Sequence, residues 1–267
     1  FLPTLGQLNA CFNIMKNFTL LVWCILALHA PVFAQGLAQK KEMKALIEEN
    51  YTLAQSQYKL LASLTPADSM PRNFNPATQK AQNSNTEWWC SGFFPGALWY
   101  IYEYTRDEEI LKEAAARLAI LEKEKHYTGN HDLGFMMFCS FGNALEIAPK
   151  EDYKDILIQS AKSLSTRFDE KVGLIKSWDS KEGDYLVIID NMMNLELLFW
   201  ASEETGDPIY RDIAITHADN TIKNHFRDDY STYHVINYNP NTGEVNKKHT
   251  AQGYADESAW ARGQAWG

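Results

Sequence analysis

Residues 191–226 read NMMNLELLFWASEETGDPIYRDIAITHADNTIKNHF, and this stretch decides the fold class. Residues 191–204 are apolar on nearly every side, a pattern typical of a helix that is covered all round. The Thr-Gly-Asp-Pro sequence at 205–208 breaks the helix. Residues 209–226 then show apolar positions at helical spacing with polar positions between them. The stretch predicts a buried helix, a tight turn and a half-exposed helix.

The same unit occurs twice more, earlier in the chain. Residues 95–104 and 133–147 are strongly apolar, and residues 108–125 and 152–168 are amphipathic, with a short break inside each pair. A further amphipathic stretch covers residues 37–64. A period of about 50 residues indicates a repeat architecture. A ring of hairpins with the apolar helices inside satisfies this pattern, which predicts an all-α fold of the α/α toroid type. An open solenoid of tetratricopeptide type fits less well, because its units are shorter and the loops here are long and aromatic.

The first 34 residues have the features of an export leader rather than of a folded domain. Residues 1–14 precede the plausible start methionine, Met15, and we interpret them as upstream translation. Residues 15–34 combine a basic start, an apolar core and small residues before the expected cleavage site, as in a secretory signal peptide. The apolar core is short for a membrane span, which needs about 20 residues. We therefore expect residues 35–267 to be the exported part, periplasmic, and not membrane-bound in its mature form.

The charge and cysteine content exclude several classes of function. The chain carries 25 basic and 34 acidic residues, a formal net charge of −9. Such a chain does not attract nucleic acid or anionic membrane by general electrostatics. After removal of residues 1–34 only Cys90 and Cys139 remain, and because both have aromatic and apolar neighbours we expect them to be buried free thiols. No metal-ligand spacing, Gly-x-Ser-x-Gly motif or phosphate loop occurs, so we expect no metal and no cofactor.

The long connections that enter the apolar helices contain the candidate site residues. These are Trp89, Asp132, Trp178, Asp190, His234, Gln252, Trp260, Arg262 and Trp266. In a toroid such loops share one end, and aromatic rings with paired carboxylates indicate a site that processes saccharides. Asp132 and Asp190 each precede an apolar helix, where the alternative role of a carboxylate is N-capping. The alternative for the tryptophans is packing in the core. The apolar residues 187–189 before Asp190 favour a buried carboxyl, whose pKa burial would raise.

Five stretches in this order resemble glycoside hydrolase family 88, the unsaturated glucuronyl hydrolases. They are residues 89–99 (WCSGFFPGALW), 131–135 (HDLGF), 190–194 (DNMMN), 231–234 (STYH) and 252–266. Cys90 departs from the pattern, in which threonine is more common. The resemblance implies an (α/α)6 barrel, which agrees with the toroid expected from the repeats. Because family members continue past this length, and residues 260–267 read as the start of a helix, we expect the chain to be the N-terminal two-thirds of one catalytic domain, with an incomplete ring.

The resemblance also implies the roles of individual residues. Asp190 matches the catalytic acid/base and Asp132 the second essential carboxylate. The tryptophans at 89, 260 and 266, together with His234, Gln252 and Arg262, match positions that line the substrate pocket, and Trp178 is a further aromatic candidate. The implied reaction removes a 4,5-unsaturated uronic acid from the non-reducing end of a lyase-generated glycosaminoglycan oligosaccharide by hydration of the C4=C5 bond. Arg262 is a natural partner for the substrate carboxylate.

Three alternatives remain open at the level of sequence. The first is an unsaturated rhamnogalacturonyl hydrolase, with the same barrel and the same chemistry on pectin fragments; residues 93–96 and 260–264 favour family 88. The second is another α/α-barrel enzyme such as a sugar epimerase, which would need paired catalytic histidines, whereas only His234 is well placed. The third is a non-catalytic, exported helical-repeat protein that binds saccharides.

Overall fold

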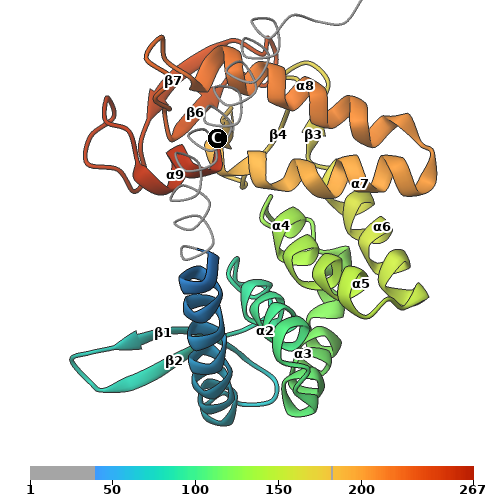
Figure 1. Cartoon of the computed structure of the whole chain (residues 1–267). Helices are drawn as coiled ribbons and strands as arrows, with labels where there is room; N and C mark the ends of the chain where they lie inside the picture. The colour runs from blue at the N-terminus through green and yellow to red at the C-terminus, as the bar shows by residue number, and fades with distance from the viewer. Residues whose placement is uncertain (1–39, 182) are drawn as a thin grey trace, which may run out of the picture. The chain divides into compact units, whose positions relative to one another are not determined.

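The computed structural model describes residues 40–181 and 183–267 (Figure 1). The chain divides into two units, the first described over residues 40–54 alone and the second comprising Gln55–Gly267. Residues 40–54 of the first unit are helical, and the second unit begins with helical residues 55–64. The expected upstream segment and signal peptide lie outside the described residues. Within the described part of the chain, no helix has the length and apolar character needed to cross a membrane.

Three helical hairpins form the main part of the second unit and follow one another in Figure 1 from teal through green to orange. The first pairs α2 (Phe93–Thr105) with α3 (Glu108–Leu121), which continues into the 3₁₀ helix η1 (Glu122–His126). The second joins α4 (Leu133–Met137), η2 (Phe138–Gly142) and α5 (Asn143–Ile147) to α6 (Glu151–Ser165). The third consists of the 3₁₀ helix η3 (Ile189–Asn194), α7 (Leu195–Thr205) and α8 (Pro208–His225). A last helix, α9, covers Ala261–Trp266. These hairpins confirm the helices predicted from the repeats.

The turn of the third hairpin follows directly from its sequence. Gly206 adopts a left-handed conformation with φ of 72°, and its N–H donates to the Ser202 carbonyl 2.9 Å away. Glycine adopts this conformation without steric cost, so it ends α7. The Asp207 side chain then accepts from the Ile209 N–H at 3.0 Å, and Pro208 occupies the first turn of α8. Both features are typical of a helix start.

The inner helix of the second hairpin contains a π-helical turn. Residues 133–147 were predicted as one apolar helix, and they run without interruption as α4, η2 and α5, with η2 in π geometry. Leu133, Phe135, Met136 and Met137 are each at most 1% exposed. The α4 part is therefore covered on all sides, as its composition predicted, whereas the α5 part, offset from it by the π turn, includes the exposed Glu146.

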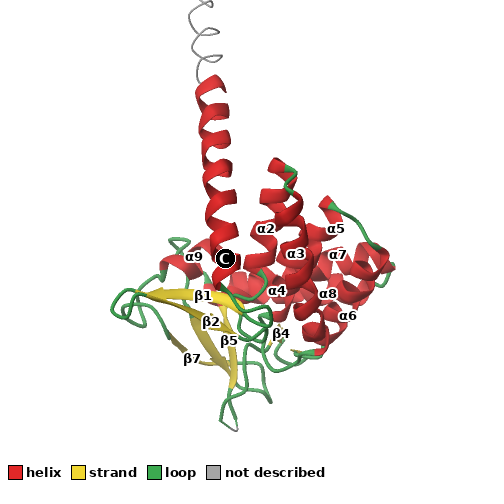
Figure 2. Ribbon diagram, turned by 90° about the horizontal axis from the view of Figure 1, so that it is seen from below, coloured by secondary structure: helices red, strands yellow, loops and turns green. Residues whose placement is uncertain are grey.

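Three small antiparallel sheets accompany the hairpins and were not foreseen in the sequence. They pair β1 (Met70–Asn75) with β2 (Lys80–Ser84), β3 (Phe168–Asp169) with β4 (Leu174–Ile175), and β5 (Tyr185–Ile188) with β6 (Val235–Tyr238) and β7 (Val245–His249). Figure 2 shows β1, β2, β5 and β7 toward one side of the hairpins. Val187 and Ile236 are fully buried in the core cluster of the third sheet. This sheet carries the segments that enter η3 and α9.

Cys90 and Cys139 are free thiols, as expected. Cys90 and Cys139 are half-buried rather than fully buried. Burial raises the pKa of Cys90, and it raises the pKa of Cys139 to about 11. At neutral pH both therefore carry neutral thiols.

Candidate active site

The register of the third sheet brings Asp190 and His234 together from distant parts of the sequence. Ile188, at the end of β5, is paired with Val235, at the start of β6. One residue beyond this pair, the Ile189 N–H donates to the His234 carbonyl at 3.0 Å. Asp190 follows at once in η3 and is only 4% exposed. Strand pairing thus fixes the two side chains on the same edge of the sheet, with their closest polar atoms, Asp190 Oδ2 and His234 Nε2, 3.8 Å apart.

The surroundings of Asp190 favour its neutral, protonated form. The pKa of Asp190 is raised from 3.8 to about 7, mainly by burial; a backbone N–H and the Arg262 charge lower it, and the negative charge of Asp132 also raises it. Burial dominates because a carboxylate loses more solvation energy than a carboxylic acid on leaving water. A carboxyl group with a pKa near 7 is suited to general acid and general base catalysis at neutral pH.

His234 is a neutral donor that faces this carboxyl group. Burial lowers the pKa of His234 to about 4, and the Arg262 charge contributes in the same direction. The Ala251 N–H donates to His234 Nδ1 at 3.2 Å. Because a backbone N–H can only donate, Nδ1 is an acceptor and the ring proton is on Nε2. The protonated nitrogen is therefore the one that faces Asp190.

Asp132 lies at the start of α4, next to a buried histidine. Its Oδ1 is 3.3 Å from His131 Nε2, and its side chain is 20% exposed. Neither candidate carboxylate makes a capping bond: Asp132 is the N-cap of α4 without a side-chain cap hydrogen bond, and Asp190 lies inside η3. The capping alternative considered for both residues is therefore not realised, and both carboxyl groups are free for other roles.

Arg262 lies within a cage of three tryptophan rings. Its Cζ is 4.3 Å from the ring centroid of Trp260, 5.2 Å from Trp89 and 5.5 Å from Trp266. Its Nη2 donates to Gln252 Oε1, and no carboxylate of the described chain lies within ion-pair distance. The rings hold the planar guanidinium by cation–π contact and leave its charge available for an anionic ligand.

The cage contacts the histidine that faces Asp190. The Trp260 ring stacks on the His234 imidazole, with centroids 4.2 Å apart and planes inclined by 30°. Trp89 and Trp266 also contact Phe135, on α4, at centroid distances of 6.3 and 5.8 Å. Seven of the nine residues singled out in the sequence belong to one connected group through the contacts given above, and Asp132 joins it through His131, whose ring centroid lies 6.4 Å from that of Phe135. The aromatic contribution of Phe135 was missed, because an apolar residue inside an apolar helix has no signature of its own.

Trp178 is placed beside the group through its backbone. It forms an isolated antiparallel bridge with Asn130, and the His131 N–H donates to the carbonyl of its neighbour Ser177 at 2.9 Å. Its half-buried ring makes no ring contact with the three tryptophans of the cage within the described residues. The structure therefore places Trp178 next to the loop that carries Asp132, and its role as a substrate-binding residue stays a prediction.

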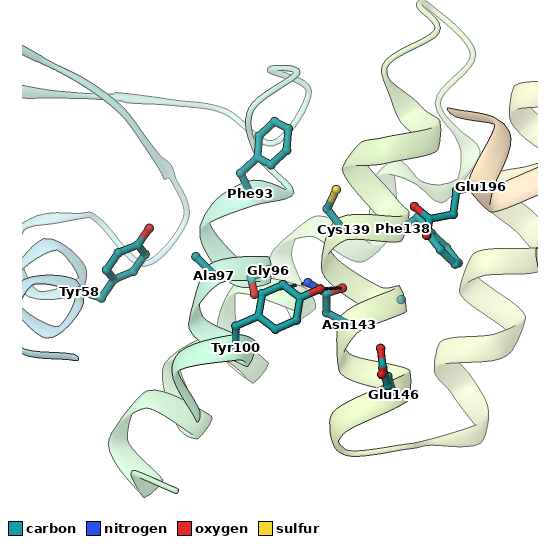
Figure 3. Close-up of a pocket in the computed structure, with 11 residues that line it drawn as sticks. Tyr58, Phe93, Gly96, Ala97, Tyr100, Phe138, Cys139, Asn143, Glu146 and Glu196 are labelled. Atoms are coloured by element: carbon teal, nitrogen blue, oxygen red, sulfur yellow. Dashed lines mark hydrogen bonds between the residues drawn. The ribbon is translucent and has the colours of Figure 1, made fainter. Parts of the chain in front are cut away.

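A separate cavity of about 480 Å³ lies along the inner helices (Figure 3). Tyr58 and side chains of α2 lie on one side and Cys139, Phe138 and Glu196 on the other, with Tyr100 donating to Asn143 Oδ1 at 3.2 Å. Its charged lining groups are two carboxylates, Glu146 and Glu196, and none of the nine predicted residues lines it. An anionic sugar is repelled by such a lining, so the size of this cavity does not identify it as the site for a uronate.

The sequence matches the family model Glycosyl Hydrolase Family 88 over residues 65–267. The chain belongs to this family. It is 43% identical over 232 residues to the unsaturated glucuronyl hydrolase of Formosa agariphila, covering 85% of this chain and 58% of that protein. It is 40% identical over 200 residues to the unsaturated chondroitin disaccharide hydrolase of Streptococcus pyogenes serotype M1, covering 72% and 50%. A crystal structure of an unsaturated glucuronyl hydrolase specific for heparin superposes with a TM-score of 0.78 at 43% identity, covering 82% of this chain and 58% of that one.

These similarities confirm the family-88 resemblance and the α/α-barrel fold class inferred from the sequence. The family-88 chain spans 58% and 50% of the length of the two curated relatives. In residues 40–181 and 183–267, no three His, Cys, Asp or Glu side chains gather in a way that could hold a metal ion.

Proposed function

We propose that this family-88 protein removes a 4,5-unsaturated uronic acid from the non-reducing end of lyase-generated glycosaminoglycan oligosaccharides. The single observation that carries the proposal is the pairing of a buried, protonated Asp190 with a cationic Arg262 in one connected site. An acid with a pKa of about 7 can protonate a carbon–carbon double bond at neutral pH, and the guanidinium can bind the carboxylate conjugated to it.

The first step is protonation of the double bond. The Asp190 carboxyl transfers its proton to C4, and the π electrons of C4=C5 form the new C–H bond. Positive charge develops at C5 and is shared with a lone pair of the ring oxygen. The Asp190 carboxylate produced at the same moment faces the Nε2–H of His234, 3.8 Å from Oδ2. Because His234 stays neutral, no imidazolium cation stands beside Asp190 before the proton is transferred. The neutral N–H still stabilises the negative charge of the carboxylate that forms.

The second step is the addition of water. The Asp190 carboxylate accepts a proton from a water molecule while the water oxygen bonds to C5, which regenerates the acid and gives a hemiketal. Opening of the hemiketal breaks the bond between C5 and the ring oxygen, moves the C5 hydroxyl proton to that oxygen, and leaves a ketone at C5 and a hemiacetal at C1. The hemiacetal then collapses: its hydroxyl proton passes to the aglycone oxygen, an aldehyde forms at C1, and the aglycone leaves as an alcohol. Asp132, whose side chain is 20% exposed, assists by raising the pKa of Asp190, which favours a protonated acid at the start of each cycle.

The cage provides recognition in an otherwise acidic protein. With a net charge of −9, the chain repels an anionic oligosaccharide at long range. Arg262 offsets this repulsion locally, because its planar fork suits bidentate binding of a carboxylate. The faces of Trp89 and Trp266, which contact one another at a centroid distance of 6.0 Å, offer apolar surface for the sugar ring.

The test follows the absorbance of the conjugated uronate in the far ultraviolet, with unsaturated chondroitin, heparin and pectin fragments. The wild-type protein is compared with Asp190→Asn and with Asp152→Asn, which removes an exposed carboxylate on α6. We expect bleaching by wild type and Asp152→Asn on glycosaminoglycan fragments, and a loss of at least about 100-fold in Asp190→Asn. Bleaching of pectin fragments alone would assign the rhamnogalacturonyl activity instead. Binding without turnover by the wild type, unaffected in Asp190→Asn, would identify a binding protein.

We further propose that the protein is exported and acts in the periplasm, on the strength of the leader-like residues 15–34. Cell fractionation with N-terminal sequencing of the mature protein tests this. A start at Gln35 or nearby in the periplasmic fraction supports export, and an uncleaved cytoplasmic chain contradicts it.

A further inference from the structure

His131 is a buried imidazole that the reaction as written does not use. It is 1% exposed, and its backbone N–H is tied to the Ser177 carbonyl. Burial lowers the pKa of His131, although the neighbouring charge of Asp132 opposes this. The ring is therefore neutral at neutral pH and carries one proton, on either Nδ1 or Nε2. His131 Nε2 lies 3.3 Å from Asp132 Oδ1. The Asp132 carboxylate therefore faces an N–H donor if the proton is on Nε2, and a lone pair if it is on Nδ1.

Asn194 settles the position of this proton. The Phe135 N–H donates to Asn194 Oδ1 at 3.1 Å, and a backbone N–H can only donate, so the amide orientation is fixed. Asn194 Nδ2 then faces His131 Nδ1 at 3.2 Å. Since an amide nitrogen can only donate, Nδ1 is the acceptor and the ring proton is on Nε2. The dipole of this N–H points its positive end toward the Asp132 carboxylate.

The same amide is attached to the turn that carries Asp190. Asn194 Nδ2 also donates to Asn191 Oδ1 at 2.9 Å, and Asn191 Nδ2 donates to the Ile175 carbonyl at 2.9 Å. Both asparagines are fully buried. Gly134 leaves room for this arrangement, because a Cβ at that position would lie 2.4 Å from Asn194 Oδ1. A chain of buried hydrogen bonds thus runs from η3 to the residue beside Asp132.

We propose that His131 and Asn194 are positioning residues that hold the Asp132 carboxylate in a fixed place relative to Asp190. The inference rests on the proposed function, since it assigns the chain of hydrogen bonds to the same two carboxyl groups. His131 acts through its Nε2–H, and Asn194 acts by fixing the tautomer of His131. Neither residue needs to touch the substrate. Each of the two carboxyl groups thus has a neutral histidine N–H beside it, His234 at Asp190 and His131 at Asp132.

The electrostatic consequence reaches Asp190. The groups that interact electrostatically with the two carboxyl groups include His131, Cys90 and Tyr127 at Asp132, and His234 and Arg262 at Asp190; Arg167 acts on His131 and Tyr127. Burial raises the pKa of Cys90 and Tyr127 and lowers that of the two histidines, so these four are neutral near pH 7. Asp132 is consequently the negative charge that raises the pKa of Asp190. A carboxylate that moves away from its place weakens this effect.

The experiment reads the tautomer and the activity separately in the full chain. Asn194→Asp replaces the amide donor by a carboxylate, which can only accept and so favours a proton on His131 Nδ1. His131→Leu removes the ring, and His131→Gln restores a donor. Asn143→Asp is the matched control, because Asn143 lies on α5 and its Oδ1 accepts from Tyr100, a role that aspartate keeps.

The first readout is ¹⁵N NMR of the imidazole rings between pH 5 and 8, which needs no substrate. We expect His131 in the wild type to keep its proton on Nε2 and not to titrate, and Asn194→Asp to move the proton to Nδ1 or to protonate both nitrogens. A wild-type His131 that carries its proton on Nδ1, or that titrates in this range, would overturn the proposal.

The second readout is the pH profile of turnover on unsaturated chondroitin disaccharide. We expect Asn194→Asp and His131→Leu to lower kcat by about 10–100-fold with a smaller effect on KM. Their alkaline limb should move to lower pH, with partial recovery in His131→Gln and a wild-type profile in Asn143→Asp. Profiles identical to the wild type in all variants would also overturn the proposal. If His131→Leu does not fold, the pH profile of Asn194→Asp alone tests the proposal. If the wild type turns over none of the fragments, the proposed function fails, and the ring spectra still decide the role of Asn194.

Discussion

Asp190→Asn is expected to stabilise the folded protein at alkaline pH and to leave its stability unchanged in acid. Burial holds the pKa of Asp190 near 7 in the folded state, against 3.8 for the exposed group. Because the folded-state pKa is the higher one, the favourable contribution of the protonated carboxyl is complete below about pH 4. It is lost as the pH rises through about 7, since the folded protein then has to bury a charge. Asparagine cannot ionise and avoids this loss.

The structure sets the size of the effect. A rise in pKa from 3.8 to about 7 corresponds to about 4 kcal/mol of folding free energy, at about 1.4 kcal/mol per pH unit. The buried amide of asparagine keeps part of the desolvation cost, so we expect a gain of about 2–4 kcal/mol above pH 8. For a chain of this size that is a rise in Tm of about 5–15 °C.

Urea denaturation of wild type, Asp190→Asn and Asp152→Asn at pH 4 to 9 measures this difference. The stability curves of wild type and Asp190→Asn should coincide at pH 4 and diverge progressively above pH 5. Asp152→Asn, at an exposed position, should follow the wild type throughout. Parallel curves for wild type and Asp190→Asn over the whole range would refute the buried, protonated acid, and with it the first step of the proposed reaction.

Three further outcomes are expected. The kcat/KM for an unsaturated disaccharide should fall about tenfold per pH unit above the Asp190 pKa of about 7, and a flat profile from pH 6 to 9 would exclude Asp190 as the acid. Arg262→Lys should lower kcat/KM by about 10–100-fold, mostly through KM, because an ammonium cannot bind a carboxylate in bidentate fashion or lie flat between indole rings; unchanged KM would contradict carboxylate binding there. Gly134→Ala should cost about 1–3 kcal/mol of stability in thermal unfolding, because its Cβ would lie 2.4 Å from Asn194 Oδ1; an unchanged Tm would contradict the close packing.

The helical hairpins were predictable because each follows from local sequence. The Gly206-Asp207-Pro208 turn ends α7 and starts α8 within a residue of the expected positions. The Asp107 side chain likewise starts α3 by accepting from the Glu109 and Ile110 N–H groups. Capping and turn residues act on neighbours in the chain, so their effect can be read without knowing the tertiary structure.

The small sheets and the polar network could not be predicted in the same way. β5 and β6 are only four residues long each and lie far apart in the sequence. Neither a pattern of alternating apolar and polar residues nor a hairpin turn therefore predicts their pairing. Asp190 and His234 could be named as candidates from the motifs, but their contact depends on this register. The roles of Asn191 and Asn194 depend on which atoms of other segments surround their amides, which local sequence does not determine.

In the inner helix of the second hairpin, the π-helical turn at Phe138–Gly142 changes the rotation of α5 about the helix axis relative to α4. An α-helix advances by about 100° per residue, so one residue of extra chain in the turn rotates everything after it by that angle. Deleting a single residue from the turn would regularise the helix but swing Asn143–Ile147 by a quarter of a circle against α4, whose start carries Asp132. Length variation among relatives should therefore be tolerated in the surface loops and avoided in this segment, although it is itself helical.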